Sequence, residues 1–298
     1  MKRLYVLVLA LLTVACKAQY TLTDLENAIN KSDTQLVSAI LMNDDIYTEK
    51  DLLKFANVTI NKTKNFEILK LLCENGLSVN STLQIKKEHF ITEKRLLHVA
   101  IEYDRTNFTN YLLTNGADIT FPYYNYSDFV CYCFTNFKNK DLSFLLNYIN
   151  EENYTQIDLV NLCRIFIVDK KFDDIAVLLQ KEYVKKTLSE NSKFPPVILL
   201  NYSDELINRM SAEFALLKLN YSDYKTCLAN SIMSLNPDSV RFAISCGVNP
   251  STELDWYDEP CSPKEYIENY INHLCSLDVA EKEKIKQSLY KALLENRL

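Results

Sequence analysis

The three glycines of this 298-residue chain all occur in one short pattern, which constrains the fold more than any other feature. Gly76, Gly116 and Gly247 each follow an apolar triplet and two further residues. An amphipathic helix that ends in a left-handed residue gives this pattern, because glycine adopts positive φ without a steric penalty. Since every glycine ends the same pattern, the chain is predicted to repeat one structural unit.

The same apolar triplet recurs along the chain without its glycine. The triplets end at Leu41, Cys73, Leu113, Leu146, Leu179 and Ile244. Successive copies are therefore 32, 40, 33, 33 and 65 residues apart. The interval of 40 indicates an insertion of seven residues into a period of 33, and the interval of 65 predicts a weaker copy near Met210. A constant period of this length is typical of repeat proteins.

A second apolar block lies 16 residues before the end of the triplet. It is clearest at 97–101, and the other blocks are Leu25 with Ala28 and Ile29, 130–134, 163–167, 197–200 and 228–232. Apolar residues at positions i, i+3 and i+4 form one face of a helix. Each unit is therefore predicted to hold two short helices, joined by a tight turn and packed against the neighbouring pair.

One unit, at 95–120, resembles the ankyrin repeat. Leu97-His98-Val99-Ala100 is similar to the second part of the T-P-L-H-x-A phrase of that family, and residues 112–118 are similar to its second-helix ending. Arg95 and Leu96 stand where the family has Thr-Pro, so that cap is lost. The resemblance implies that His98 bonds to backbone in the turn.

Weaker copies extend the resemblance over residues 20–251, as about seven units. The resemblance implies an all-α, ankyrin-like helical-hairpin repeat solenoid over 19–261 that acts as a scaffold or adaptor for another protein. The alternative is a helical-hairpin solenoid of another repeat family. Residues 262–298 are predicted to form C-terminal capping helices, because Ser262-Pro263-Lys264-Glu265 is a capping box that opens an apolar stripe.

The first 18 residues have the pattern of a secretory signal peptide. Lys2 and Arg3 precede an apolar run at 4–14, and small residues follow up to Ala18. This run is too short to span a bilayer, which needs about 20 apolar residues. The expected localisation is therefore secreted or extracellular, with cleavage after Ala18 or Ala15. The alternative is a membrane-anchored bacterial lipoprotein, with lipid on Cys16.

Cysteines and glycosylation sequons agree with export. Removal of the signal leaves eight cysteines, an even number, and an oxidising compartment favours their pairing. The disulfide candidates are Cys131, Cys163, Cys246, Cys261 and Cys275, with Cys131–Cys163, Cys246–Cys261 and Cys261–Cys275 as alternative pairs. Buried free thiols that act as small apolar side chains are the other interpretation. Nine Asn-x-Ser/Thr sequons favour a glycoprotein of a eukaryotic secretory route.

Composition argues against several classes of function. A net charge of −6 disfavours nucleic-acid binding, which depends on neutralising phosphates. Three glycines are too few for phosphate-binding loops, and three histidines with no Gly-x-Ser-x-Gly give no hydrolase pattern. The Cys and His spacings match no common zinc module. We therefore expect no catalytic residue, no cofactor and no metal.

Two aromatic loops and one basic insertion are candidate partner-binding segments. The aromatic candidates are Phe121, Tyr123, Tyr124, Tyr126, Trp256 and Tyr257. Tyr and Trp dominate binding hot spots, although the same residues can fold back onto neighbouring units. The insertion at 83–94 is locally basic and suits either an acidic partner or plain solvated surface.

The sequence thus predicts a secreted, monomeric, non-enzymatic protein–protein interaction module, either a host-directed effector or an extracellular adaptor. It carries no membrane span after signal removal and no nucleic-acid site. The alternative is a bacterial cell-envelope lipoprotein with a structural or protective role. A cysteine- or metal-dependent enzyme is a third class, which would need a histidine beside a cysteine in the folded chain.

Overall fold

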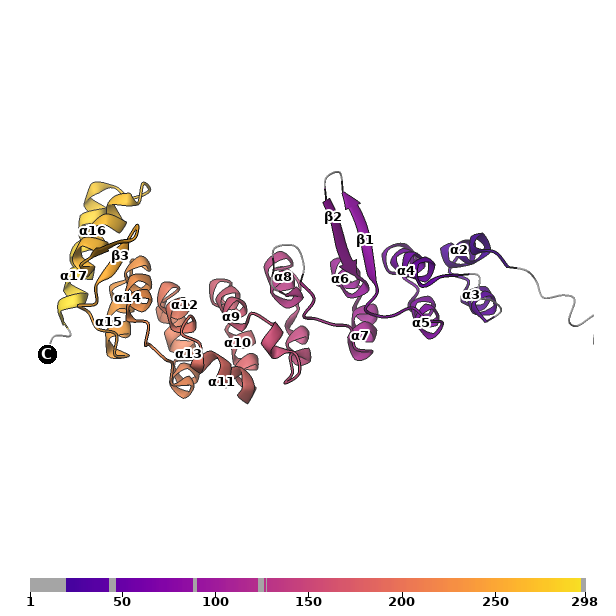
Figure 1. Cartoon of the computed structure of the whole chain (residues 1–298), viewed down its shortest axis with the longest axis horizontal. Coiled ribbons are helices and arrows are strands. Elements are labelled where there is room, and N and C mark those ends of the chain that lie inside the picture. Colours follow the sequence, from indigo (N-terminus) through magenta and orange to yellow (C-terminus); the bar gives the residue numbers. More distant parts are fainter. Residues whose placement is uncertain (1–19, 43–46, 88–89, 123–125, 127, 296–298) are drawn as a thin grey trace, which may run out of the picture. The chain divides into compact units, whose positions relative to one another are not determined.

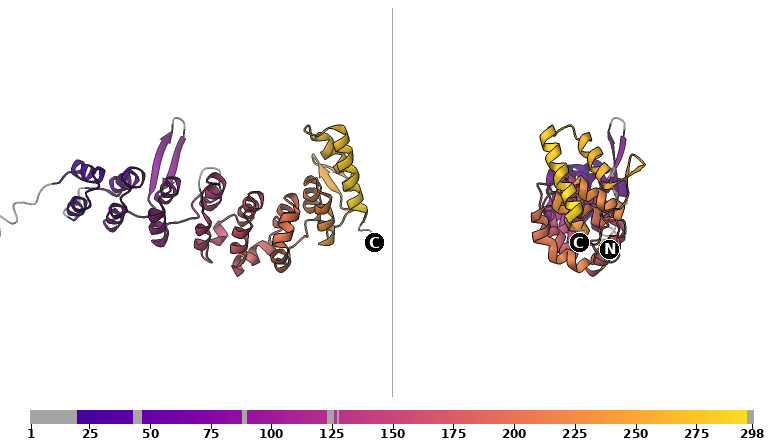
Figure 2. Two further views of the ribbon diagram at one scale, coloured as in Figure 1. Left: turned by 180° about the vertical axis from the view of Figure 1, so that it is seen from behind. Right: turned by 90° about the vertical axis from the view of Figure 1, so that its left-hand side faces the viewer.

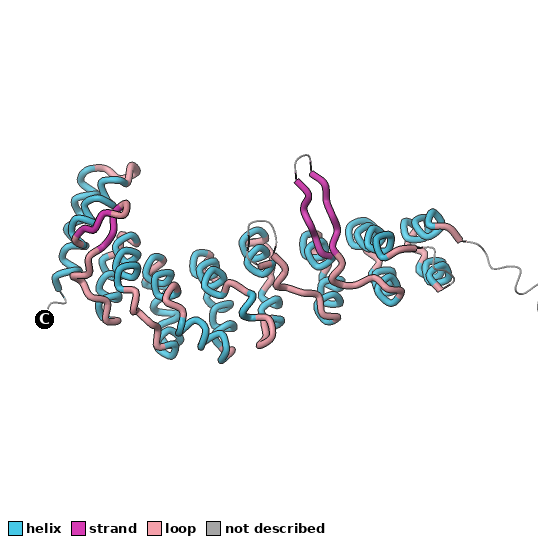
Figure 3. The backbone as a smooth tube through the Cα atoms, in the orientation of Figure 1, coloured by secondary structure: helices cyan, strands magenta, loops and turns pink. Residues whose placement is uncertain are grey.

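The computed structural model describes residues 20–42, 47–87, 90–122, 126 and 128–295. The chain divides into two compact units, Met1–Asn125 and Tyr126–Leu298. Helices make up most of the described residues, which confirms the all-α class, and Figure 3 shows strands in two hairpins. The signal peptide predicted at 1–18, with Cys16, lies outside the described residues.

The first unit consists of short helices and one hairpin. Its elements are α2 (Leu22–Asn30), α3 (Thr34–Leu41), α4 (Glu49–Val58), the π-helical turn η1 (Thr59–Thr63), α5 (Phe66–Glu74), β1 (Thr82–Lys87), β2 (Phe90–Arg95), α6 (Leu96–Glu102) and α7 (Thr106–Thr114). Helices α2, α4 and α6 pack side by side in one row, and α3, α5 and α7 pack in a second row (Figure 1). The helix pairs expected from the sequence are present in this unit.

The second unit continues with helices and ends in a helical pair. Its elements are α8 (Phe129–Asn136), the 3₁₀ turns η2 (Ser143–Tyr148) and η3 (Tyr154–Gln156), α9 (Leu159–Val168), α10 (Phe172–Leu179), α11 (Glu182–Glu190), α12 (Phe194–Leu200), α13 (Asp204–Leu217), α14 (Tyr224–Met233), α15 (Pro237–Ser245), β3 (Leu254–Trp256), β4 (Glu259–Cys261), α16 (Pro263–His273) and α17 (Val279–Glu295). Helices α8, α9, α12 and α14 pack in sequence, and α17 packs on both α15 and α16 (Figure 1).

The apolar triplets form the cores of these units. Each triplet lies in the second helical segment of a pair, and the weaker copy near Met210 lies in α13. The middle residues of the six triplets are completely buried; they are Ile40, Leu72, Leu112, Leu145, Leu178 and Ala243. Burial of one such side chain stabilises a fold by about 2 kcal/mol. The helical period found in the sequence therefore marks the buried face.

Most helix pairs turn through a left-handed residue at the same position. Ser32, Lys64, Asp104, Lys170 and Leu235 have positive φ, and each stands two residues before a second helix begins. In three of these turns the chain closes a Schellman motif. In α2, for example, the N–H of Ser32 donates to Ile29 (2.9 Å) and that of Asp33 to Ala28 (2.9 Å). Repetition of one turn gives each pair similar geometry.

Second helices end in the same motif where glycine is present. Gly76, Gly116 and Gly247 have φ values of +103°, +82° and +98°. After α15, the N–H of Gly247 donates to Ile244 (2.9 Å) and that of Val248 to Ala243 (3.1 Å). This observation confirms the C-terminal role predicted for the three glycines.

Hydrogen bonds join neighbouring helix pairs within each unit. Asn65 Nδ2 donates to Thr34 Oγ1 (3.1 Å) in the first unit. In the second unit, the buried carboxylate of Asp128 accepts from the backbone N–H of Asp158 (3.0 Å). The partners are 31 and 30 residues apart, close to the sequence period. Contacts to the neighbouring pair are the ones that a stack of repeats requires.

The structure corrects the predicted loops in two places. The insertion at 83–94 is the antiparallel hairpin β1–β2 rather than a loop, and it projects beyond the helices of its unit (Figure 2). The connection at 255–259 is also a hairpin, β3–β4. Both were predicted as loops because the search for a helical period does not detect the alternation of every second residue that marks a β-strand. The capping box at Ser262 is confirmed, since Glu265 N–H donates to Ser262 Oγ and Ser262 N–H donates to Glu265.

The glycine after α15 offers a test of the turn geometry. No atom lies within 4 Å of the position that a Cβ on Gly247 would take, so Gly247→Ala meets only a conformational penalty. We expect Gly247→Ala to lower the free energy of unfolding by about 1 kcal/mol. Gly247→Asn is the matched control and should lose less, because asparagine tolerates the left-handed region. Urea unfolding followed by the emission of Trp256 measures both; equal losses would contradict the assignment.

Candidate functional site

The β3–β4 hairpin presents the aromatic residues predicted at 256–257. Trp256 pairs with Glu259 in the ladder, so Tyr257 and Asp258 form a two-residue turn. Both turn residues have positive φ, at +50° and +67°, which defines a type I′ turn. This turn normally uses Asn-Gly, and a tyrosine in the left-handed region costs about 1 kcal/mol. Backbone strain of this kind concentrates at functional positions.

The two aromatic residues of this hairpin have different environments. The ring of Trp256 is half-buried and packs edge-on against Tyr266 (5.5 Å between ring centroids) and Tyr270 (6.5 Å) of α16. Tyr257 is 74% exposed, and its ring lies 5.1 Å from that of Trp256 and 6.3 Å from His273. Trp256 thus folds back onto the neighbouring helix α16, which was one of the two outcomes expected for the aromatic loops, whereas Tyr257 faces solvent.

Acidic residues surround Tyr257. Asp255, Asp258 and Glu259 are all exposed within the hairpin. Lys225 Nζ of α14 donates to both carboxylate oxygens of Asp255, at 2.9 and 2.8 Å. These hydrogen bonds raise the pKa of Lys225. The name "tyrosine tip" is used below for Tyr257 with Asp258 and Glu259.

The other aromatic loop is largely structural where it is described. The guanidinium of Arg95 lies over the ring of Phe121, 4.0 Å from its centroid, and Arg95 Nη1 donates to Asp118 (2.8 Å). Tyr126 packs edge-on against Tyr132 of α8, with 5.5 Å between ring centroids. Tyr123 and Tyr124 lie outside the described residues. Nothing in the described part of this loop exposes an aromatic side chain as Tyr257 does.

His98 bonds to backbone, as the resemblance implied. Its Nδ1 accepts the N–H of Arg95 (2.8 Å) at the start of α6, and the side chain is only 4% exposed. Burial, with the charges of Arg95 and Lys94, lowers the pKa of His98 from 6.5 to about 3. His98 is therefore a neutral structural residue.

The eight cysteines in the described part of the chain are free thiols. Cys131, Cys133, Cys163 and Cys227 are buried, Cys73, Cys246 and Cys261 are half-buried, and Cys275 is exposed. Burial raises the pKa of Cys163 and of Cys227 to about 12, so these thiols resist ionisation. The disulfides proposed among Cys131, Cys163, Cys246, Cys261 and Cys275 stay a prediction.

The described residues form neither a metal site nor a membrane-spanning helix. Among the described residues, no three His, Cys, Asp or Glu side chains come close enough to hold a metal ion. No helix in the described part of the chain is long and apolar enough to cross a membrane.

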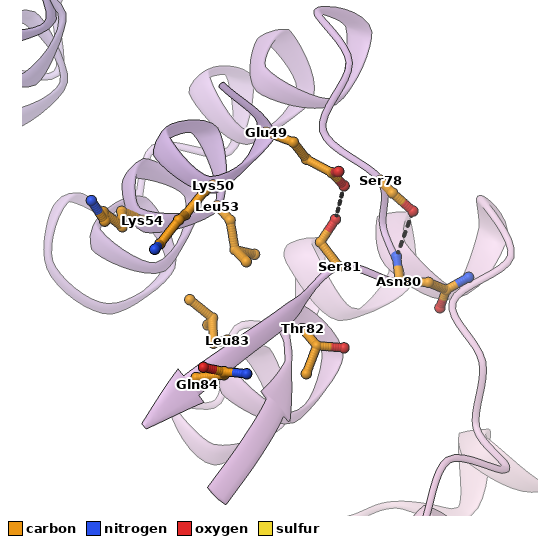
Figure 4. A pocket seen from close by; sticks show the side chains of 10 residues that line it. All are labelled: Glu49, Lys50, Leu53, Lys54, Ser78, Asn80, Ser81, Thr82, Leu83 and Gln84. Atoms are coloured by element: carbon orange, nitrogen blue, oxygen red, sulfur yellow. Dashed lines mark hydrogen bonds between the residues drawn. The ribbon is translucent and has the colours of Figure 1, made fainter. Parts of the chain in front are cut away.

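A groove of about 650 Å³ lies between α4 and β1 in the first unit. Figure 4 shows its lining, with Leu53 and Leu83 pointing toward each other across it. Its remaining lining residues, which with these two define the "α4–β1 groove", are Glu49, Lys50, Lys54, Ser78, Asn80, Ser81, Thr82 and Gln84. The sequence indicated only a basic insertion here, because the groove depends on the strand conformation of 82–87.

The pKa of His98 predicts a pH dependence of stability. The unfolded chain binds a proton at His98 below pH 6.5, whereas the folded chain stays neutral there down to about pH 3. The contribution of neutral His98 to the free energy of unfolding is therefore fully present above pH 6.5. It falls by about 1 kcal/mol for each pH unit below that value. We expect His98→Gln to flatten this fall between about pH 6.5 and pH 5, above the range where carboxylates titrate. Denaturant midpoints across that range measure it, and parallel curves for the two proteins would refute it.

Exposure and thiol pKa predict an order of cysteine reactivity. In the reduced, folded chain, Cys275 should react with iodoacetamide before the other described cysteines, because it is exposed and they are buried or half-buried. Peptide mass mapping after timed labelling reads the order, and Cys275→Ser should remove the fast phase. Fast labelling of Cys131 or Cys163 would contradict the packing of α8 and α9.

Comparison of the sequence with protein-family models and with curated proteins found no match. The tyrosine tip and the α4–β1 groove are the two surfaces whose geometry bears on function.

Proposed function

We propose that the chain is a non-enzymatic module that binds another protein, built from ankyrin-like repeats and exported by way of residues 1–18. Three observations support the repeat family: the period of 33, the recurring left-handed turn between helices, and the bond from Arg95 N–H to His98. Repeat stacks of this kind bind partners through surfaces that project from the helices.

The observation that carries the proposal is the exposure of Tyr257. A side chain of this size that is 74% exposed at a strained turn buries little area on folding, although its ring contacts Trp256. Tyrosine is enriched at binding hot spots, since its ring buries a large area at small entropic cost. We infer that a partner covers Tyr257.

The packing beneath the tip supports this inference. Leu254 is 1% exposed and anchors β3 in the core of the second unit, where Trp256 packs on Tyr266. The ring of Tyr257 therefore stands on an ordered base rather than on a free loop. A surface that is ordered before binding loses less entropy when the partner docks.

The charge of the tip indicates the kind of surface that it fits. Asp258 and Glu259 are exposed beside Tyr257, while the nearby Asp255 already pairs with Lys225. A partner with Lys or Arg residues can approach these carboxylates and place a cation on the tyrosine ring. Binding should accordingly weaken as salt is added.

A capture experiment with one variant and one control tests the proposal. The immobilised full chain captures proteins from its native medium, and mass spectrometry quantifies each one for wild type, Tyr257→Ala and Tyr103→Ala. Tyr103 is also exposed, at 39%, but lies at the end of α6 in the other unit. We expect Tyr257→Ala to reduce capture of the specific partner by at least about tenfold, with Tyr103→Ala unchanged.

Trp256 supplies the folding control. The urea midpoint of Tyr257→Ala, followed by the emission of Trp256, should stay close to that of the wild type, because the tip contributes no buried side chain. If every captured protein is retained equally by the folded Tyr257→Ala variant, the tyrosine tip is not the binding site.

A further inference from the structure

In the part of the chain that the structure describes, neither outer edge of the β1–β2 hairpin has a strand partner, and the outer edge of β1 is the one beside the α4–β1 groove. Within the described residues, β1 pairs only with β2, from Thr82–Arg95 to Lys87–Phe90. Helix α4 packs against β1 and helix α6 against β2, so the outer edge of β1 faces α4 (Figure 1). An unpaired edge carries a row of backbone N–H and C=O groups that can hydrogen-bond to an extended chain.

The α4–β1 groove lies along this edge. Its volume of about 650 Å³ is within the range of ligand sites, so a short segment of chain fits there. Leu53 from α4 and Leu83 from β1 give it an apolar floor (Figure 4). Strand addition uses such a layout, because backbone bonds supply affinity while apolar contacts select side chains.

One wall of the groove is fixed by hydrogen bonds. Asn80 Nδ2 donates to the carbonyl of Gly116 (3.0 Å), and Asn80 Oδ1 accepts from Asp118 N–H (2.8 Å). Ser81 Oγ donates to Glu49 at the groove end nearest the start of α4 (Figure 4). The site is therefore formed before a ligand enters it.

The charge of the groove selects an acidic ligand. Lys50 and Lys54 of α4 line it and are exposed, with Lys54 Nζ 3.7 Å from a carboxylate oxygen of Asp51. These two lysines outnumber the one acidic lining residue, Glu49, whose carboxylate accepts a hydrogen bond from Ser81 and keeps its charge. Positive groups beside an apolar floor favour a segment that alternates apolar and acidic residues.

We propose that the α4–β1 groove binds an extended acidic segment of a partner protein, which adds to the outer edge of β1 as a third strand. The segment spans about six residues, the length of β1. This inference deepens the proposed protein-binding function at a second surface, in the first unit, whose charge is opposite to that of the tyrosine tip.

Selection of peptides on the full chain tests the proposal. Phage-displayed random 12-residue peptides are selected on the immobilised wild-type chain, and the enriched peptide is synthesised with a fluorescent label. We expect enriched sequences to alternate apolar residues with Asp or Glu. Fluorescence anisotropy then measures the dissociation constant of this peptide for each variant.

The decisive variant reverses the charge of the groove. Lys50→Glu with Lys54→Glu should weaken peptide binding by about tenfold or more. The control, Lys31→Glu with Lys70→Glu, has the same net charge but changes exposed lysines of the same unit away from the groove. It should stay within about twofold of the wild type.

N-methylation of the peptide tests strand addition itself. In an added strand, alternate amides point toward β1, so methylating one alternate set should abolish binding and methylating the other set should not. Three results would overturn the proposal: no enrichment of acidic peptides, equal binding to both lysine variants, or equal tolerance of both methylated sets. Dimerisation through β1, seen by light scattering and lost with the groove variant, would assign the edge to a second copy instead.

These outcomes are separate from those of the tyrosine tip. Peptide binding to Tyr257→Ala should equal that of the wild type, because the residue lies in the other unit. If the peptide does not bind the α4–β1 groove, the capture experiment with Tyr257→Ala still tests the tyrosine tip. If Tyr257→Ala abolishes capture, binding of the peptide to the groove can still be measured.

Discussion

The left-handed turn between two helices is the constraint on which the rest of this structure depends. Ser32, Asp104 and Lys170 occupy it in three pairs, two residues before the second helix. The turn reverses the chain in a few residues, so the two helices of a pair pack on each other and also bury apolar side chains against the next pair. None of these three residues is glycine, so each turn adopts a conformation that costs about 1 kcal/mol. Burial of the triplets, such as Leu112 and Leu178, offsets that cost.

The helical part of the fold was predictable because its signal is local and periodic. The triplets fell in second helices, and the capping box at Ser262 began α16 as expected. Glycine at 76, 116 and 247 marked helix ends correctly, since positive φ is a property of the single residue. The left-handed turns at Lys170 and Leu235 were not predictable, because neither residue type signals that conformation.

The candidate surfaces were only partly predictable, for a different reason. The sequence identified Trp256 and Tyr257 as one aromatic segment, but their opposite exposures depend on the pairing of β3 with β4 and on α16. The insertion at 83–94 was recognised as basic, whereas its groove exists only because β1 stands beside Leu53 of α4. Contacts between segments distant in sequence decide both outcomes, and a period in one segment carries no information about them.

Both proposed surfaces occur where the chain departs from the rule that the helix pairs follow. The helix pairs bury apolar side chains and satisfy backbone groups within helices, whereas Tyr257 is exposed at a strained turn and β1 has no strand partner on its outer edge among the described residues. Proteins tolerate such local inconsistency chiefly at functional positions. The two departures differ in charge, since carboxylates flank Tyr257 and lysines line the groove. A single partner surface cannot complement both equally, so the charges favour two partner segments of opposite sign, one for each unit.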